Sequence, residues 1–291
     1  MQTETRFRIG ELSRRSGVSP DLLRAWERRY GLLRPARSSG GLRLYTKDDL
    51  LRVQAMQEHL AAGLAAAEAA AAAADQATVA QAATDTTQAR EQLEAGLLAF
   101  DDARAHAAFD LLVARFSLDT VLADILLPYL HTLGERWERG EISVAHEHYA
   151  SALIRGRLLG LARGWGQGLG PTALLACAPG EQHDLGLIAF GVALRARGWR
   201  ILYLGPDTPL DSLAEAARSS RPACVIVSAI APRALDAERD RLLDLAAEYR
   251  LAVGGAAATQ LDLGEDVLLL TGGPVDEADK LTRLEHRPDT V

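Results

Sequence analysis

Short apolar runs alternate with helix-forming stretches over residues 171–285, and this alternation restricts the fold more than any other feature of the chain. The apolar runs have the length of single strands and are Thr172–Ala178, Arg200–Leu204, Ala223–Ala229, Leu251–Gly254 and Val267–Thr271. Helices are expected near Asp184–Arg197, Pro209–Ser219, Ala234–Tyr249 and Val275–Glu285. Buried strands separated by helices form parallel sheets that are covered on both faces. The pattern therefore predicts a doubly wound, Rossmann-like α/β domain over residues 168–291.

The segment after the first of these strands carries the side chains that most suggest a binding site. Pro179-Gly180 predicts a turn, Glu181 and His183 follow on an exposed tip, and a helix begins near Asp184. Ligands bind at this end of open α/β sheets, where an imidazole can ligate a metal while a carboxylate polarises its other nitrogen. Gly186 lacks a Cβ and would let a bulky ligand approach the start of the helix. An ordinary surface histidine is an equal alternative on this segment alone.

Polar residues or glycines also end the other strands. Asp207 and Thr208 follow the second strand, Ser228 lies at the end of the third, and Gly254-Gly255 ends the fourth. No Gly-x-Gly-x-x-Gly sequence follows the first strand, so we do not expect a dinucleotide.

The first 60 residues predict a helix-turn-helix unit. A short amphipathic helix over Arg8–Gly17 leads into a tight turn, in which Ser19 is a good N-cap and Pro20 suits the first helical position. The next helix, Asp21–Tyr30, keeps arginines for its outer face, as a DNA-reading helix does. A β-hairpin wing over residues 40–45 and a helix over residues 47–60 follow.

The charge distribution indicates that only this head meets a polyanion. Residues 1–59 hold 12 Lys and Arg and 7 Asp and Glu, a net charge of +5, whereas the rest of the chain carries −12. We expect Arg37 and Arg43 to reach phosphates, Arg24 to read a base, and Tyr45 to bond phosphate or fill the core. The full set of expected DNA contacts is Arg14, Arg24, Arg28, Arg29, Arg37, Arg43 and Tyr45.

The middle of the chain is expected to hold a linker and a helical bundle. Ala65–Ala74 has high helix propensity, but Asp75–Gln88 lacks apolar periodicity, which predicts a tether over residues 76–89. Apolar residues return at helical spacing over residues 90–167. The four expected helices hold Leu93–Phe100, Phe109–Phe116, Leu118–Arg139 and Ser143–Trp165. Four amphipathic helices with short connections predict a four-helix bundle.

One end of this bundle carries a cluster that is not typical of a core. Trp137 ends the third helix and Glu147-His148 opens the fourth, so a short turn brings an indole, a carboxylate and an imidazole together. A helix-capping cluster at a solvated loop is the alternative that the bundle alone favours. His146-Glu147-His148 also suggests zinc, but the metalloprotease spacing fails because position 150 is alanine.

Two further features concern the cellular compartment. Cys177 and Cys224 lie in apolar runs and are expected to be buried free thiols of a reducing compartment. No apolar segment is long enough to span a bilayer, and no signal-peptide core follows the N-terminus, so we expect a cytoplasmic protein.

The head resembles the MerR family of winged-helix transcription regulators. The residues that carry this resemblance are Ile9-Gly10-Glu11-Leu12, Arg24-x-Trp26-Glu27-Arg28-Arg29-Tyr30-Gly31, Gly41-x-Arg43-x-Tyr45 and Asp49-Leu50. The resemblance implies a DNA-binding domain over residues 1–75 that binds a near-palindromic promoter site as a dimer, with helix 21–30 in the major groove. MerR relatives usually dimerise through a long helix that corresponds to residues 61–89, where this chain has few apolar anchors.

The rest of the chain extends the resemblance to a subgroup. Glu181-x-His183-x-x-Gly186 resembles the cobalamin-binding signature in which a histidine replaces the nucleotide base beneath cobalt, although most relatives have Asp in place of Glu181. Trp137, Glu147-His148 and Leu204-Gly205-Pro206-Asp207-Thr208-Pro209 add to it. From Arg8 to about Glu285, the chain is similar to the CarH/LitR group of MerR-like regulators, which bind adenosylcobalamin and sense light.

This resemblance implies a role for each part of the body. His183 would be the lower axial ligand of cobalt, and Trp137, Glu147 and His148 would cap the upper face from a bundle over residues 90–167. Ser228 and Gly254-Gly255, bordered by Thr208, would hold the displaced benzimidazole tail within a cobalamin-binding domain over residues 168–291. The group further implies a repressor that binds promoter DNA as a homotetramer in the dark. It would fall apart into monomers and release DNA when light breaks the cobalt–carbon bond.

Glu138 departs from the group. Relatives can place a histidine at this position, directly after the tryptophan, above cobalt after photolysis, and we expect water or His148 to take that place here. A MerR-type regulator that senses cobalamin without light is the main alternative function. A corrinoid protein of a methyltransferase system is disfavoured, because the chain has a DNA-binding head and no catalytic domain. We therefore expect a regulator without enzymatic activity and without a membrane partner.

Overall fold

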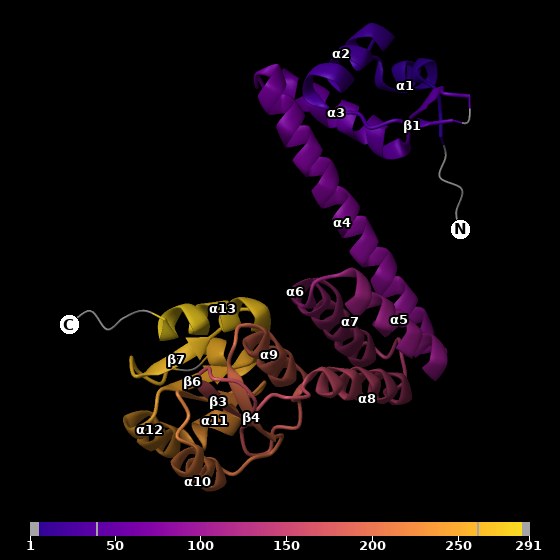
Figure 1. The fold of residues 1–291 in the computed structure, drawn as a ribbon. Coiled ribbons are helices and arrows are strands. Elements are labelled where there is room, and N and C mark those ends of the chain that lie inside the picture. The colour runs from indigo at the N-terminus through magenta and orange to yellow at the C-terminus, as the bar shows by residue number, and fades with distance from the viewer. Residues whose placement is uncertain (1–5, 39, 261, 287–291) are drawn as a thin grey trace, which may run out of the picture. The chain divides into compact units, whose positions relative to one another are not determined.

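The computed structural model describes residues 6–38, 40–260 and 262–286, with positions 79–82 described by their backbone alone. The chain divides into two compact units that meet between Gln88 and Ala89. The first unit is the head, and the second holds a helical bundle and an α/β domain (Figure 1). Among the described residues, no helix combines the length and apolar character needed to cross a membrane.

The head is a winged helix-turn-helix, as predicted. Its elements are α1 (Ile9–Ser16), α2 (Pro20–Tyr30), β1 (Ala36–Arg37), β2 (Arg43–Leu44) and α3 (Lys47–Ala61). Ser19 caps α2 because its hydroxyl accepts a hydrogen bond from the Leu22 backbone N–H at 3.3 Å. The two short strands pair antiparallel and form the wing. Thr46 and Asp49 exchange side chain–backbone hydrogen bonds in a capping box that starts α3.

Helix α4 (Ala66–Leu98) runs through residues 76–89, so the segment that the sequence predicts as a tether is helical. Residues 75–88 contain neither Gly nor Pro, and their alanines carry the helix onward without an apolar stripe. The helix is anchored at both ends: Ala69 and Ala73 are buried in the core of the head, and Leu93 and Leu97 in the core of the bundle. Tertiary packing at the two ends thus supports the helical segment between them.

The predicted bundle is present in the second unit. It consists of the end of α4, α5 (Asp102–Arg115), a long third helix and α8 (Val144–Leu161). The third helix has three parts: α6 (Leu118–Thr120), the π-helix η1 (Val121–Leu126) and α7 (Leu127–Glu138). The Leu127 backbone N–H bonds to the Leu122 carbonyl, five residues back, and the next residue, Pro128, has no N–H to donate.

The α/β domain has a parallel sheet with strand order β4-β3-β5-β6-β7, which confirms the doubly wound prediction. Its strands are β3 (Thr172–Cys177), β4 (Arg200–Gly205), β5 (Cys224–Ser228), β6 (Leu251–Gly254) and β7 (Val267–Leu270). The helices are α9 (Leu185–Ala196), α10 (Leu210–Ser220), α11 (Arg233–Asp236), α12 (Arg239–Glu248), η2 (Ala256–Gln260) and α13 (Pro274–Glu285). In the register, Cys177 lies beside Ser228, and Ser228 beside Gly254. The carboxyl ends of three adjacent strands therefore lie at one edge of the sheet.

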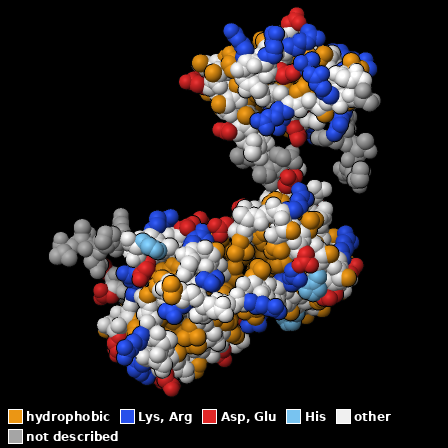
Figure 2. All heavy atoms as spheres, viewed as in Figure 1, with side chains coloured by type: hydrophobic (Ala, Val, Ile, Leu, Met, Phe, Trp, Pro, Cys, Tyr) orange, Lys and Arg blue, Asp and Glu red, His pale blue; other side chains and the backbone are white. Residues whose placement is uncertain are grey.

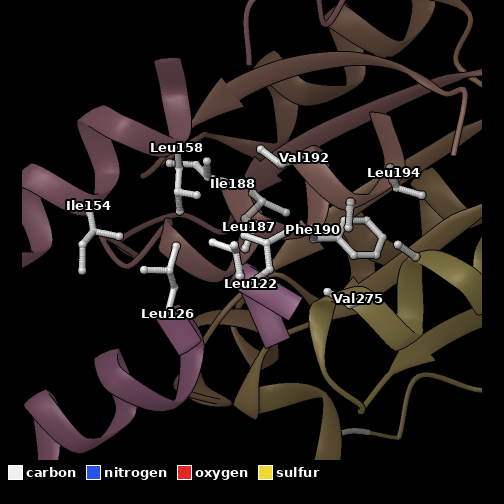
Figure 3. Packing of buried hydrophobic residues seen from close by; sticks show 14 of the residues in the cluster. Leu122, Leu126, Ile154, Leu158, Leu187, Ile188, Phe190, Val192, Leu194 and Val275 are labelled. Atoms are coloured by element: carbon white, nitrogen blue, oxygen red, sulfur yellow. The ribbon is translucent and has the colours of Figure 1, made fainter. Parts of the chain in front are cut away.

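Helices α9 and α13 cover one face of the sheet, and the bundle packs against these two helices. One continuous core joins bundle residues such as Leu122, Leu126 and Ile154 to Leu187 and Ile188 of α9 (Figure 3). The helices α10 and α12 cover the opposite face with a separate core. The bundle and the α/β domain thus share a core instead of being joined by a linker alone.

Replacing Arg197 with methionine is expected to destabilise the second unit by about 1–2 kcal/mol. Arg197 follows α9 and pairs with Asp119 of the bundle at 3.0 Å and with Asp279 of α13 at 2.6 Å. The estimate is modest because both carboxylates are about half exposed and would regain water. Urea unfolding of the variant measures the loss, and Arg241→Met, which removes a guanidinium that is 57% exposed, should lower the free energy of unfolding less.

The same pair predicts a pH dependence. The hydrogen bond from Arg197 holds the pKa of Asp279 below its ordinary value, despite partial burial. The contribution of this pair is therefore fully present above the ordinary aspartate pKa of about 3.9 and disappears as the pH falls through the lower folded-state value. A difference between wild type and Arg197→Met that stays constant from neutral pH down to strongly acidic pH would contradict this assignment.

Candidate functional site

Glu181 organises the loop between β3 and α9. Its Oε1 accepts hydrogen bonds from the backbone N–H of His183 at 2.9 Å and from the His183 Nδ1–H at 2.6 Å. Its Oε2 accepts from the backbone N–H of Ile230, just beyond β5, at 2.8 Å. The Glu181 side chain is only 6% exposed, whereas that of His183 is 75% exposed. A buried carboxylate thus holds an exposed imidazole at the edge of the sheet.

The electrostatics of this pair select one tautomer of His183. Burial raises the pKa of Glu181, but the hydrogen bonds from the backbone of Ile230 and His183, and from the imidazole, lower it and prevail. The carboxylate is therefore ionised and can only accept, which assigns the ring hydrogen to Nδ1. The lone pair is then on Nε2 of the exposed ring, as a metal-ligating histidine requires.

Asp207 and Thr208 fasten this loop to the end of β4. Asp207 adopts a left-handed backbone with φ of 48°, and its Oδ1 accepts from the Gly180 N–H at 2.7 Å. Its own N–H donates to the Glu181 carbonyl at 2.8 Å. The Thr208 hydroxyl donates to the Gly205 carbonyl, and its N–H to the Cys177 carbonyl. Both residues bond to the protein backbone, and their contact with a ligand stays a prediction.

The predicted tail slot corresponds to a cavity of about 230 Å³ beside the start of α9. Its lining includes Ser228, Gly254 and Gly255, which the sequence predicts to hold the tail, and Gly186, which it predicts to admit a ligand at the helix start, but not Thr208. Apolar side chains of α9, β5 and β7 complete it, together with Glu277 of α13. A largely apolar cavity that also offers the hydroxyls of Ser228, Thr259 and Thr271 fits an aromatic base.

Two of these glycines are needed for different reasons. At Gly255, φ is +86° and an added Cβ would lie 2.3 Å from the Ala229 carbonyl oxygen, so its backbone position excludes a side chain. At Gly186 an added Cβ would meet nothing within 4 Å, since it would point into open space. A larger side chain at Gly186 would therefore occupy the slot without disturbing the fold.

The bundle brings Glu147 toward the same loop. The Glu147 Oε1 accepts from the Ser151 hydroxyl at 2.7 Å, and its Oε2 lies 2.6 Å from Nδ1 of His148. Burial raises the pKa of Glu147. The hydrogen bonds from Ser151 and His148 lower this pKa, as do the charges of His148 and His183, and together they outweigh burial, so the pKa lies below its ordinary value. Glu147 is therefore ionised, and the charge of the exposed His183 is one of those that act on it.

Trp137 lies at the end of α7 with an unusually exposed indole. Its exposed fraction is 47%, and Glu138 beside it is also exposed. Figure 2 shows hydrophobic side chains gathered where the bundle meets the α/β domain. A single exposed hydrophobic side chain is common on protein surfaces, so contact of Trp137 with a ligand stays a prediction. Among the described residues, no group of three or more His, Cys, Asp or Glu side chains could hold a metal ion by itself.

The structure adds a connection that sequence reasoning missed. Asp184, directly after His183, is 5% exposed and pairs with Arg155 of α8 at 2.7 Å. Its Oδ2 also accepts from the Tyr203 hydroxyl of β4 at 2.5 Å. The helical spacing offered a signal, because Glu147, Ser151 and Arg155 lie four residues apart and share one face of α8.

In the head, the predicted DNA contacts are exposed except for Tyr45. Arg28 and Arg29 of α2 and Arg37 of the wing are exposed. Arg24 pairs with Asp21 at 2.9 Å, and Arg14 pairs with Glu11. Several Lys and Arg side chains are spread over the face of the head that Figure 2 shows.

Tyr45 lies fully buried in the core of the head, which is one of the two roles expected for it. Its hydroxyl donates to Glu27 Oε2 at 3.1 Å, while Arg43 Nε donates to Glu27 Oε1 at 2.9 Å. Burial, and then the charge of Glu27, raise the pKa of Tyr45 to about 12. Glu27 of α2 thus holds the wing against the helix that is expected to read DNA.

Comparison with known families assigns each part of the chain. Residues 7–76 match the MerR HTH family regulatory protein model, and residues 89–159 and 171–284 each match a model described as a B12 binding domain. The α/β domain and bundle resemble the structure of the Methanosarcina barkeri monomethylamine corrinoid protein. That comparison has a TM-score of 0.53 and 17% identity, and covers 68% of this chain and 96% of the other, which shows a shared fold.

Two regulators from Myxococcus xanthus are similar over nearly their whole length. The chain is 33% identical over 270 residues to the HTH-type transcriptional repressor CarH, covering 88% of this chain and 90% of the relative. It is also 33% identical over 260 residues to the HTH-type transcriptional repressor CarA, covering 87% of this chain and 88% of the relative.

Proposed function

The chain belongs to the family of B12-binding MerR-type transcription regulators that includes CarH and CarA, and from this premise we propose that it is a light-released repressor. It would bind promoter DNA as an oligomer, a tetramer in the dark, when it holds adenosylcobalamin. Illumination would separate the oligomer into monomers and release the DNA. The observation that carries the proposal is an exposed imidazole, oriented by a buried carboxylate, beside a glycine-lined slot in a chain with a DNA-binding head.

The residues present fit this group. His183 Nε2 would ligate cobalt, and the slot lined by Gly186, Ser228 and Gly254 would receive the benzimidazole tail. When bound, adenosylcobalamin supplies a cobalt–carbon bond that visible light can break. The protein contributes a fixed tautomer of His183, a carboxylate at Glu147 that can accept from hydroxyl or amine groups, and an exposed indole at Trp137. Trp137 and Glu147 would contact the adenosyl group in the dark and would lose this contact after illumination. The difference in contact would change the position that the bundle prefers.

Glu138 makes the illuminated state of this chain a separate proposal. A carboxylate is a poorer partner for cobalt than an imidazole, so we expect water or His148 above the metal after light. His148 is 74% exposed and its Nδ1 pairs with Glu147, which leaves its Nε2 side open for such a role. A bis-histidine spectrum that survives His148→Ala would contradict this expectation.

Two other functions compete with this proposal. A regulator that senses cobalamin as a metabolite would use the same lower site without a response to light. A corrinoid carrier for methyl transfer would share the bundle and the α/β domain, as the fold likeness to a corrinoid protein illustrates. The head favours a regulator over a carrier, because it matches the MerR family and exposes arginines on α2 and the wing.

Retention of DNA tests the proposal. Adenosylcobalamin-loaded protein, mixed in the dark with fragments of its own genome, is expected to retain a discrete set of fragments and to release them under green light. Fragments that stay bound after illumination would contradict light release and would support the metabolite-sensing alternative.

Replacing Trp137 with alanine is expected to weaken binding of adenosylcobalamin more than binding of methylcobalamin. The indole offers a large apolar face that an adenosyl group can cover and a methyl group cannot, and aromatic contacts of this kind contribute about 0.5–1.5 kcal/mol beyond area burial. Calorimetric titration with both cobalamins in the dark measures the ratio of the two affinities. Equal weakening of both would contradict an adenosyl-specific cap.

In the head, Arg43→Ala and Arg24→Ala are expected to differ in kind. Arg43 lies on the wing, donates to Glu27 of α2 and is assigned to a phosphate. Its loss should weaken binding to every DNA sequence and reduce the slope of log affinity against log salt concentration by about one. Arg24 is assigned to a base, so its loss should relax the preference at one position by about 1–3 kcal/mol. Binding to selected and mismatched sites at several salt concentrations distinguishes them, and an unchanged site preference in Arg24→Ala would refute its assignment.

A further inference from the structure

A three-residue contact joins the His183 loop to the bundle. Arg155 of α8 reaches the Asp184 carboxylate with Nε at 3.0 Å from Oδ1 and 2.8 Å from Oδ2, and with Nη2 at 2.7 Å from Oδ2. The Tyr203 hydroxyl donates to the same Oδ2 at 2.5 Å. Asp184 is 5% exposed, so these donors satisfy a carboxylate that has left water.

The contact is directional in a way that apolar packing is not. A guanidinium that uses two nitrogens on one carboxylate fixes both the distance and the relative rotation of the two groups. Apolar contacts between α8 and α9, where Leu158 lies near Ile188 in Figure 3, tolerate small sliding movements. Arg155 and Asp184 therefore set the relative position of α8 and the loop within a surface that would otherwise slide.

Helix α8 connects this contact to the carboxylate of Glu147. Glu147, Ser151 and Arg155 lie at successive intervals of four residues on one face, and Ser151 donates to Glu147 at 2.7 Å. Eight residues of helix span about 12 Å. The same rigid element thus presents the Glu147 carboxylate at one end of the stripe and anchors the residue next to His183 at the other.

Tyr203 is held in place from its other side. Its ring makes an edge contact with Trp165, with centroids 5.8 Å apart, and Trp165 lies in the connection between bundle and sheet. The loop, the helix that carries Glu147 and the edge strand β4 therefore converge on one carboxylate. No part of the proposed function assigns a role to this group of residues.

We propose that Arg155 is a positioning residue that presets the separation between His183 and Glu147. This inference rests on the proposed function in one respect, namely that His183 and Glu147 contact the two faces of one cobalamin. With the Arg155–Asp184 pair intact, the site fits a corrinoid with an adenosyl group on its upper face. Without it, α8 and the loop move independently, and the site no longer discriminates by the size of the upper ligand.

The test compares Arg155→Gln with Arg157→Gln. Arg157 lies on the same helix but pairs with Asp110 of α5, so it is a matched control. In cobalamin-free protein, hydrogen exchange of the amides of residues 180–185 is expected to rise about 10- to 100-fold in Arg155→Gln, the effect of losing a charge-assisted hydrogen bond. Arg157→Gln should leave exchange at these amides unchanged.

A second readout addresses selectivity. The ratio of adenosylcobalamin to methylcobalamin affinity should fall toward one in Arg155→Gln and stay at the wild-type value in Arg157→Gln. It should be partly restored in Arg155→Lys, which keeps the positive charge but cannot donate to the carboxylate from two nitrogens. If Arg155→Gln does not fold, Tyr203→Phe removes one donor to Asp184 and should shift both readouts in the same direction by a smaller factor. Loop exchange or selectivity that matches the control would overturn the proposal. Wild-type protein that binds no cobalamin would refute the proposed function, while the exchange experiment would still decide whether the contact orders the loop.

Discussion

Replacing His183 with alanine is expected to abolish ligation of cobalt by the protein. Its Nδ1 is committed to Glu181, so Nε2 is the one nitrogen of this ring that offers a lone pair. Loss of an outer-shell partner typically costs about 10- to 100-fold in metal affinity, and loss of the ligand itself should cost more. The measurement is the paramagnetic resonance spectrum of protein loaded with cob(II)alamin, in which a coordinated nitrogen splits the cobalt lines.

Isotope labelling makes this test specific. Protein grown with ¹⁵N-histidine should show doublet splitting from ¹⁵N, whereas coordination by the cobalamin's own ¹⁴N base would give triplets. The splitting from ¹⁵N should be lost in His183→Ala and kept in His131→Ala, a control that removes an exposed histidine of α7. An unchanged ¹⁵N doublet in His183→Ala would refute the assignment of the lower ligand.

Replacing Gly186 with leucine is expected to eliminate cobalamin binding while the cobalamin-free protein stays at least as stable as wild type. An added Cβ at Gly186 meets nothing within 4 Å, and the residue lines the 230 Å³ cavity, so the leucine side chain would fill the slot instead of clashing with the protein. Gly186 is also the second residue of α9, and replacing a helical glycine gains up to about 1 kcal/mol. Thermal unfolding without cobalamin and calorimetric titration with it measure the two effects.

Gly160→Leu is the matched control for this substitution. Gly160 is an exposed helical glycine of α8 at which an added Cβ also meets nothing within 4 Å, but it does not line the cavity. Its stability should change as in Gly186→Leu, and its cobalamin affinity should stay at the wild-type value. Wild-type affinity in Gly186→Leu would mean that the tail does not enter this cavity.

The parts of the fold that were predictable are those in which local pattern and tertiary structure agree. The alternation of apolar runs and helices identified the parallel sheet, and the residues at its strand ends converge as the topology requires. Ser228, Gly254 and Gly186 could be grouped because parallel strands end at one edge of a sheet. The cap of α2 at Ser19 followed from the chemistry of helix ends.

The parts that were not predictable depend on contacts distant in sequence. The segment 76–89 lacks an amphipathic pattern, yet it is helical because alanine propensity and anchored ends outweigh that lack. Tyr45 could have bonded phosphate, but Glu27 of α2 provides a partner in the core. Likewise, helical spacing places Arg155 on the face of Glu147 and Ser151 but does not identify its partner, because Asp184 lies 29 residues after Arg155 and Tyr203 lies 19 residues after Asp184.

The most direct test of the account is the molar mass in solution of adenosylcobalamin-loaded protein, measured by light scattering in the dark and again after green light. We expect about four times the mass of one chain in the dark and the mass of a single chain after illumination. An unchanged mass would contradict light-driven disassembly and make cobalamin sensing without light the leading function.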